Sequence, residues 1–104
     1  MSEKEPRIEE DVESDQQVQL DEPPLYRVLL LNDDYTTMDF VVDVLKYVFK
    51  KSDEDAHRIM LNVHRSGFGV CGVYPRQIAE TKIDAVDSLS REKGFPLKCT
   101  MERE

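Results

Sequence analysis

The chain has little of what several protein classes depend on. It contains no tryptophan, only four glycines and only two cysteines among its 104 residues. Cys71 and Cys99 lie far apart, each inside an apolar run, a pattern typical of buried free thiols in a cytosolic protein rather than of a disulfide. No apolar run approaches the roughly 18 residues that cross a bilayer, and the polar, acidic start excludes a secretory signal peptide. We therefore expect one small cytoplasmic domain.

Basic charge is also scarce. Residues 1–22 hold nine acidic residues against two basic ones, whereas the remainder of the chain is almost neutral. A nucleic-acid-binding domain would need a basic stripe, and none is visible. Residues 1–23 also lack aromatic residues and any hydrophobic period, so the sequence predicts a disordered extension before a folded domain over 24–104. From the residues alone, this extension is either a solubilising leader or an arm that engages a partner.

Six elements are expected from the apolar periodicity and the capping residues. The first strand is apolar almost throughout, which suits a strand covered on both faces or flanked by neighbours. The expected elements are a strand over 25–31, a helix capped by Thr36 with apolar positions from 38 to 49, a helix capped by Ser52 and ended by Gly67, a strand over 68–74, a helix from Pro75 to Gly94, and a strand over 97–101.

The predicted order of elements is β-α-α-β-α-β. If each element reverses the direction of the chain, the first strand runs antiparallel to the second. The second and third strands then run parallel to each other. Because the first strand has the most continuous apolar run, it belongs in the centre of a three-stranded sheet. The sequence thus predicts a small α+β domain with its helices packed on the sheet.

Asn32, Asp33 and Asp34 follow directly after the predicted central strand. A turn accounts for one or two such residues, but three acceptors beside the apolar Met38 indicate something more. His64 stands four residues after Met60 on the second helix, so the two share one line along it. A protonated α-amino group offers three donors, and a neighbouring hollow would take the first side chain of the same peptide. These residues therefore favour recognition of a peptide N-terminus.

Two other classes stay open at this point. One is an enzyme, either a metal-dependent hydrolase using Asp33, Asp34 and His64 or a thiol enzyme pairing Cys71 with His64. No recognisable metal-ligand spacing supports the first. The other class is an interaction module like the C-terminal domain of the ribosomal stalk protein, which shares this strand and helix order. Such a module would bind a translation factor and ignore peptide N-termini.

Four stretches, LNDDYTTMDFVVDVL, MLNVHRSG, CGVY and AETK, occur in an order and spacing that resemble the ClpS family, the adaptors of the bacterial Clp ATP-dependent protease. The resemblance covers about residues 24–103. It implies an α/β sandwich with a three-stranded antiparallel sheet and three helices. It also implies a monomeric cytoplasmic adaptor without catalytic activity or cofactor. Such an adaptor binds proteins that begin with Leu, Phe, Tyr or Trp and delivers them to the ClpA or ClpC unfoldase.

The resemblance also assigns roles to residues. Asn32, Asp33 and His64 match the residues that bind the α-amine, whereas the role of Asp34 stays open. Met38 matches a gatekeeper against β-branched first residues. The residues that resemble the walls of the side-chain pocket are Thr36, Met38, Val41, Met60, Val63 and Leu97. The candidates for the unfoldase contact are Tyr35, Glu80 and Lys82.

By the same resemblance, the acidic extension is an arm needed for delivery. Two departures from the family pattern are visible. Thr37 stands where many members have Pro, so the loop before the first helix has less fixed geometry here. Gln77 stands where the family has a Glu near the unfoldase contact. Neither departure touches the amine acceptors.

Overall fold

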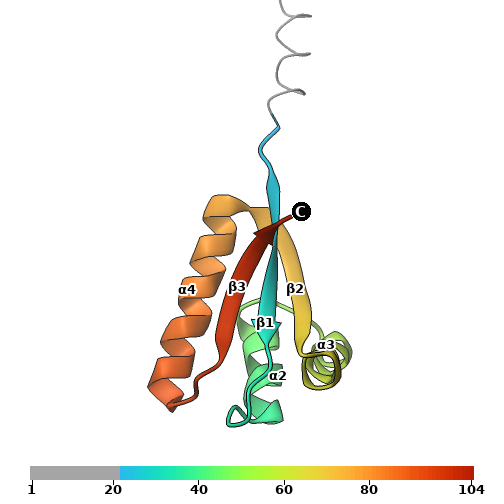
Figure 1. Cartoon of the computed structure of the whole chain (residues 1–104), viewed down its shortest axis with the longest axis vertical. Helices are drawn as coiled ribbons and strands as arrows, with labels where there is room; N and C mark the ends of the chain where they lie inside the picture. Colours follow the sequence, from blue (N-terminus) through green and yellow to red (C-terminus); the bar gives the residue numbers. More distant parts are fainter. Residues whose placement is uncertain (1–21) are drawn as a thin grey trace, which may run out of the picture.

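The computed structural model describes residues 22–104. The extension predicted over 1–23 falls almost wholly outside the described residues, so its disorder and its role in delivery stay predictions. Figure 1 shows the six elements, in the predicted order β-α-α-β-α-β. They are β1 (Leu25–Leu31), α2 (Met38–Tyr47), α3 (Asp53–Ser66), β2 (Phe68–Pro75), α4 (Arg76–Lys93) and β3 (Lys98–Arg103).

The three strands form one sheet in the order β2-β1-β3. Both neighbours run antiparallel to β1, with Leu30 opposite Gly69 on one side and Cys99 on the other. The predicted central position of the first strand and the parity of the connections are therefore confirmed. A register shift between Val28 and Leu29 marks a bulge in the pairing with β2.

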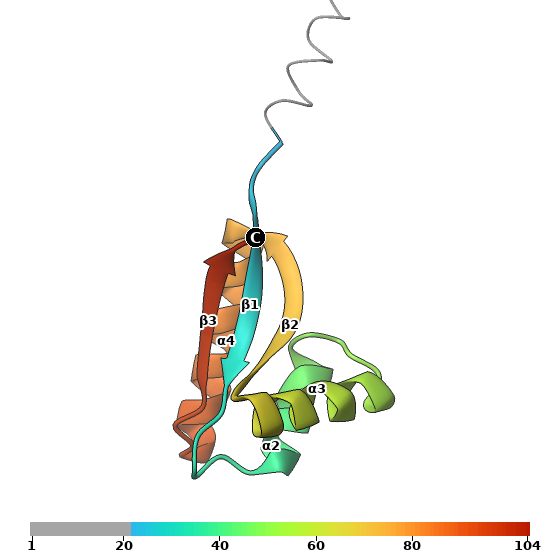
Figure 2. The same cartoon turned by 45° about the vertical axis from the view of Figure 1, so that its right-hand side comes forward.

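The core lies on one face of the sheet. Val28, Leu30, Cys71 and Cys99 point to that face and are buried. In Figure 2, α4 passes behind β3 and β1, on the face of the sheet to which these buried side chains point. Along β1 the intervening residues are only half-buried, so the strand is flanked by neighbours rather than covered on both faces. Of the two alternatives for the apolar run of β1, the flanked central strand is the one that the structure shows.

Capping residues explain where the helices begin and end. The Ser52 hydroxyl accepts a hydrogen bond of 3.1 Å from the amide of Asp55 and caps the start of α3, as predicted. Gly67, with φ of 93°, ends the same helix, also as predicted. The prediction of Thr36 as the cap of α2 is wrong by one residue. Thr37 occupies that position, and its hydroxyl accepts the amide of Phe40 at 3.1 Å.

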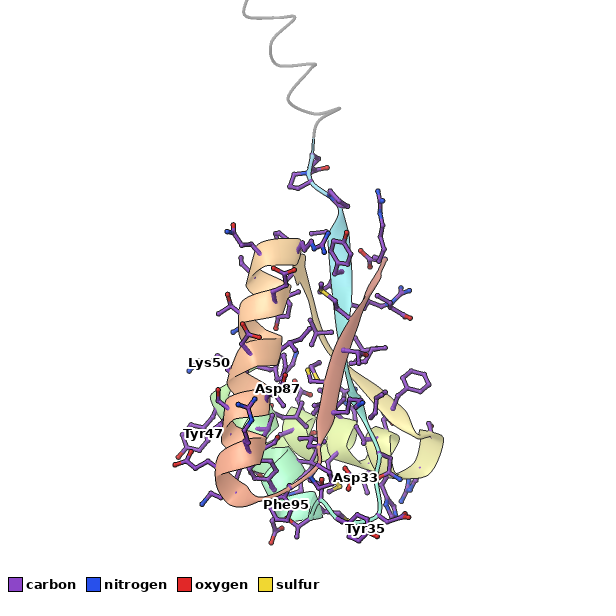
Figure 3. All side chains as sticks on the ribbon, turned by 60° about the vertical axis from the view of Figure 1, so that its left-hand side comes forward. Asp33, Tyr35, Tyr47, Lys50, Asp87 and Phe95 are labelled. Atoms are coloured by element: carbon purple, nitrogen blue, oxygen red, sulfur yellow. The ribbon has the colours of Figure 1, made fainter. Side chains whose placement is uncertain are left out.

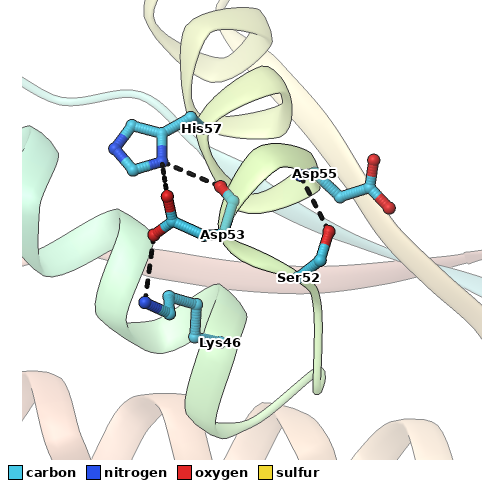
Figure 4. A network of polar contacts seen from close by, with 5 residues as sticks. All are labelled: Lys46, Ser52, Asp53, Asp55 and His57. Carbon is cyan, nitrogen blue, oxygen red and sulfur yellow. Dashed lines mark hydrogen bonds and ion pairs between the residues drawn. The ribbon is translucent and has the colours of Figure 1, made fainter.

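A small polar network joins α2 to α3 at the surface (Figure 4). The Lys46 ammonium donates to the Asp53 carboxylate at 3.0 Å, and the Nδ1 of His57 lies 3.7 Å from the same carboxylate. The hydrogen bond from Lys46, its charge and the His57 ring together hold the pKa of Asp53 below its ordinary value. The network links the last turn of α2 to the start of α3 at the protein surface.

At its other end, α3 packs very closely against β2. A Cβ atom added at Gly69 would lie 2.8 Å from Val63 Cγ2 and 3.1 Å from the Ile59 carbonyl oxygen. These distances are shorter than ordinary van der Waals contact, so a side chain here would push the helix away from the strand. Glycine at this position therefore fixes how near Val63, and with it the last turn of α3, can come to the sheet.

We predict that Gly69→Ala destabilises the fold by about 1–3 kcal/mol, the usual cost of overpacking a core. This cost should exceed the gain of about 0.4–1 kcal/mol that Ala brings by restricting the unfolded chain. Urea unfolding followed by circular dichroism measures the difference. Val70→Ala, on the half-open face of the same strand, serves as the control for β2 itself. An unchanged urea midpoint for Gly69→Ala would show that α3 can move away from β2 without loss of stability.

Candidate functional site

A cavity of about 250 Å³ opens between the loop after β1, the start of α2 and the end of α3. Eight of the nine residues predicted to bind the α-amine or to wall the side-chain pocket line it, together with Asp34. The lining residues are Asn32, Asp33, Asp34, Thr36, Met38, Val41, Met60, Val63 and His64. Segments about 30 residues apart in sequence thus meet at one site.

Leu97 is the predicted pocket residue that the cavity does not include. Its side chain is buried in the core just before β3 and lines a different small hollow, beside Phe95 and Pro96. Phe95 in turn packs against Phe40 of α2, with ring centroids 5.0 Å apart. Leu97 therefore lies outside the residues that line the cavity, and its contact with a bound side chain stays a prediction.

The inner wall of the cavity is apolar. Val41 of α2 and Met60 and Val63 of α3 are all buried, because their helical spacing turns them toward the space between the two helices. Met38, the first residue of α2, is 44% exposed and stands at the rim. An apolar group that enters the cavity would therefore pass Met38 before reaching the buried wall.

The opposite side of the cavity carries hydrogen-bond acceptors. Asn32 and Asp34 are exposed on the loop, and His64 is exposed on the last turn of α3. A backbone hydrogen bond of 2.9 Å from Asn32 N to Gly67 O ties the loop to the end of α3. This bond holds Asn32 and His64 around the same opening, although they come from different elements.

Asp33 is fixed by hydrogen bonds within its own loop. Its Oδ1 accepts the amides of Tyr35 and Thr36 at 2.8 and 2.7 Å, and its Oδ2 accepts the Thr36 hydroxyl at 2.7 Å. Partial burial raises the pKa of this carboxyl, but the three hydrogen bonds outweigh burial and lower the pKa below its ordinary value. Asp33 is thus a charged acceptor in a defined orientation.

A second, larger hollow of about 840 Å³ lies between the end of α2 and one side of α4. Tyr47 and Ile78 line it and are 73% and 47% exposed. Lys82 also lines it: its ammonium donates to the Val48 carbonyl at 2.8 Å and lies 5.6 Å from the centre of the Tyr74 ring. Tyr47 is one of the apolar positions predicted between 38 and 49, yet it lies at the surface, and no pattern in the sequence identifies Ile78 as exposed.

The three predicted unfoldase contacts do not share one surface. Lys82 lines the larger hollow. Glu80 is exposed on α4, and its carboxylate accepts a hydrogen bond of 3.1 Å from Arg76 Nε. Tyr35 stands on the loop beside Asp33, away from Tyr47 and Lys50 (Figure 3). The structure therefore groups Glu80 and Lys82 on α4 and places Tyr35 near the smaller cavity.

The two cysteines lie in the core. Cys71 is fully buried, and burial together with the nearby Cys99 raises the pKa of its thiol far above the ordinary value. Burial, with the charge of Asp87, raises the pKa of Cys99 to about 12. Because the thiolate is the nucleophile, these thiols are poorly suited to catalysis, so the geometry does not favour a Cys71–His64 enzyme.

Within residues 22–104, no group of three or more His, Cys, Asp and Glu side chains is arranged to hold a metal ion. Over the same part of the chain, none of the helices has the length and apolar character needed to span a bilayer.

Fold and cavity together define the class: a small α+β domain with an apolar pocket rimmed by hydrogen-bond acceptors. Comparison with known proteins gives the family. The model of the family "ATP-dependent Clp protease adaptor protein ClpS" matches residues 21–100, and the chain belongs to this family.

Relatives match all or most of the chain. The chain is 55% identical over 104 residues to the ATP-dependent Clp protease adapter protein ClpS of Desulforapulum autotrophicum, covering 100% of both. It is 61% identical over 82 residues to the ClpS of Maricaulis maris, covering 79% of this chain and 75% of the relative. A solved structure of Agrobacterium tumefaciens ClpS2 bound to L-phenylalaninamide matches with a TM-score of 0.77 and 49% identity, covering 80% of this chain and all of that one.

The lowered pKa of Asp33 predicts a pH-dependent contribution to stability. A carboxyl whose pKa is lower in the folded protein stabilises the fold above its ordinary value of 3.8. That contribution is lost as pH falls through the lower, folded value. Asp33→Asn should therefore be less stable than the unsubstituted protein at pH 6, and the difference should shrink as pH falls from about 4 toward 2. Urea unfolding at several pH values measures it, and a constant difference would contradict the assignment.

Proposed function

We propose that this chain is a non-catalytic adaptor that binds proteins through a free N-terminal Leu, Phe, Tyr or Trp and delivers them to a Clp unfoldase. One observation carries the proposal: a single cavity combines a buried apolar wall with amide, carboxylate and imidazole acceptors at its mouth. L-phenylalaninamide, which the similar Agrobacterium tumefaciens structure binds, has a free amine beside an apolar side chain. The cavity offers a partner for each of these groups.

The amine has a chemical reason to bind here. An α-ammonium has three donors, and Asn32, Asp33 and His64 each present an acceptor when His64 is neutral. The carboxylates of Asp33 and Asp34 line the same cavity and favour positive charge. A charge-assisted hydrogen bond contributes about 1.5–3 kcal/mol, so the amine contacts decide whether a peptide binds.

The apolar wall has a reason to select the first side chain. Burying a Leu- or Phe-sized group against Val41, Met60 and Val63 contributes about 1.5–3 kcal/mol. Met38 stands at the rim, where a branch at Cβ of the ligand would meet it first. This position supports its assignment as the gatekeeper that excludes Ile and Val.

We predict that binding requires a free and charged N-terminus. A Leu-first peptide should bind, and its N-acetylated form should not. Affinity should fall above about pH 8, where the peptide amine loses its proton. Fluorescence anisotropy across this pH range measures the fall.

His64→Ala should weaken binding of a Leu-first peptide, because one acceptor of the amine is lost. His57→Ala is the matched control, because His57 lies on the same helix but belongs to the network with Asp53 and Lys46. Equal affinity for free and acetylated peptides would refute the amine site. Undiminished affinity of His64→Ala would remove His64 from it.

Docking on the unfoldase would use a different surface. The hollow between α2 and α4 presents Tyr47 and Ile78 to solvent, with Lys82 at its edge and Glu80 nearby on α4. An exposed apolar patch rimmed by charged groups is typical of a protein interaction site. We infer that the N-terminal domain of ClpA or ClpC binds here, in the cytoplasm, and that the adaptor acts as a monomer. Gln77, where the family has Glu, directly precedes Ile78 on α4 and is exposed.

We predict that Tyr47→Ser and Ile78→Ser each weaken docking on the isolated ClpA or ClpC N-terminal domain by more than about tenfold, because exposed aromatic and aliphatic anchors dominate such interfaces. Affinity for a Leu-first peptide should not change. Val73→Ser, on the open sheet face and 39% exposed, is the control whose exposure is closest to that of Ile78. Isothermal titration with both unfoldase domains also identifies the partner, and undiminished docking would place the contact elsewhere.

A further inference from the structure

Thr36 lines the cavity, and its hydroxyl is bound to a carboxylate. It donates to Asp33 Oδ2 at 2.7 Å, while the amide of the same residue donates to Asp33 Oδ1 at 2.7 Å. Thr36 therefore holds both oxygens of one carboxylate. Thr37 caps α2, so the hydroxyl of Thr36 has no role in starting the helix.

These bonds leave little freedom to the Asp33 carboxylate. Oδ1 accepts two backbone amides and is fully used, whereas Oδ2 accepts the Thr36 hydroxyl and keeps one lone pair. The rotation of an aspartate carboxylate about its last bond is broad, and contacts at Oδ1 alone would leave the plane of the group free to turn. The bond from Thr36 fixes that plane and therefore the direction of the remaining lone pair.

We propose that Thr36 is a positioning residue for amine recognition: its hydroxyl orients the Asp33 carboxylate so that the free lone pair of Oδ2 meets the α-ammonium of the bound peptide. This inference rests on the proposed function of the cavity. It assigns to the hydroxyl a role different from that of a pocket wall. The methyl group of Thr36 can still contact the first side chain.

The two roles predict opposite results for one substitution. Thr36→Val keeps the shape of the side chain and replaces the hydroxyl by a methyl group. If Thr36 serves only as a wall, a more apolar wall should bind Leu or Phe at least as tightly. If its hydroxyl orients Asp33, binding should weaken, because the charged acceptor loses its fixed direction.

The experiment compares Thr36→Val and Thr36→Ser by anisotropy with Leu-, Phe-, Tyr- and Trp-first peptides. Thr36→Val should weaken all four by a similar factor of about ten, which corresponds to roughly 1.4 kcal/mol, because the amine is common to them. Thr36→Ser retains the hydroxyl and should restore most of the affinity. In an Asp33→Ala background, Thr36→Val should cause no further loss, as a double-mutant cycle requires of a residue that acts through its partner.

A spectroscopic measurement separates this role from a general loss of loop structure. NMR titration of the free protein should show that Thr36→Val raises the pKa of the Asp33 carboxyl, since one of the bonds that lower it is gone. The amides of Tyr35 and Thr36 should stay protected from hydrogen exchange, because they still donate to Oδ1.

Several results would overturn the inference. Thr36→Val could bind the peptides as tightly as the unsubstituted protein or more tightly, or it could lose affinity by a factor that depends on the first residue. It could also cause the same loss of affinity in the Asp33→Ala background. Lastly, the pKa of Asp33 could be unchanged in Thr36→Val. Failure of the unsubstituted protein to bind any Leu-first peptide would instead refute the proposed function. In that case the titration of Asp33 would still test whether Thr36 holds the carboxylate.

Discussion

The backbone hydrogen bond from Asn32 N to Gly67 O, 2.9 Å long, is the contact on which the geometry of the cavity depends. It joins the end of the central strand to the residue where α3 stops and the chain turns into β2. Gly67 can make that turn because it adopts a φ of 93°, which side chains rarely allow. The loop after β1 and the last turn of α3 are thereby held around one opening, and the acceptors of both reach the same space.

The local sequence predicts most of the fold. It does not predict features that depend on contacts between residues in different elements. Ser52 and Gly67 bound α3 through bonds to their own neighbours, so the pattern alone identifies them. Thr36 and Thr37 satisfy the same capping pattern equally well. Only the bonds of Thr36 to Asp33 decide between them, and those bonds depend on how the whole loop folds.

The same reasoning applies to the cavities. Met60 and His64 share a helix face by spacing alone, so their meeting at the smaller cavity was predictable. Tyr47 follows the apolar spacing of α2 equally well, yet it is exposed, because a hollow separates the end of α2 from α4 at this point. Whether a helical position is buried depends on where the neighbouring helix ends, and α4 is more than 25 residues away in sequence.

Helix α2 connects the two hollows. Met38, its first residue, stands at the rim of the smaller cavity, and Tyr47, its last residue, lines the larger hollow. At about 1.5 Å per residue, they are separated by roughly 14 Å along the axis, with a buried row of side chains between them. A ligand in one hollow therefore does not cover the other. Because buried side chains of α2 separate the two hollows, the proposed function requires no competition between a peptide at one end of the helix and a large partner at the other.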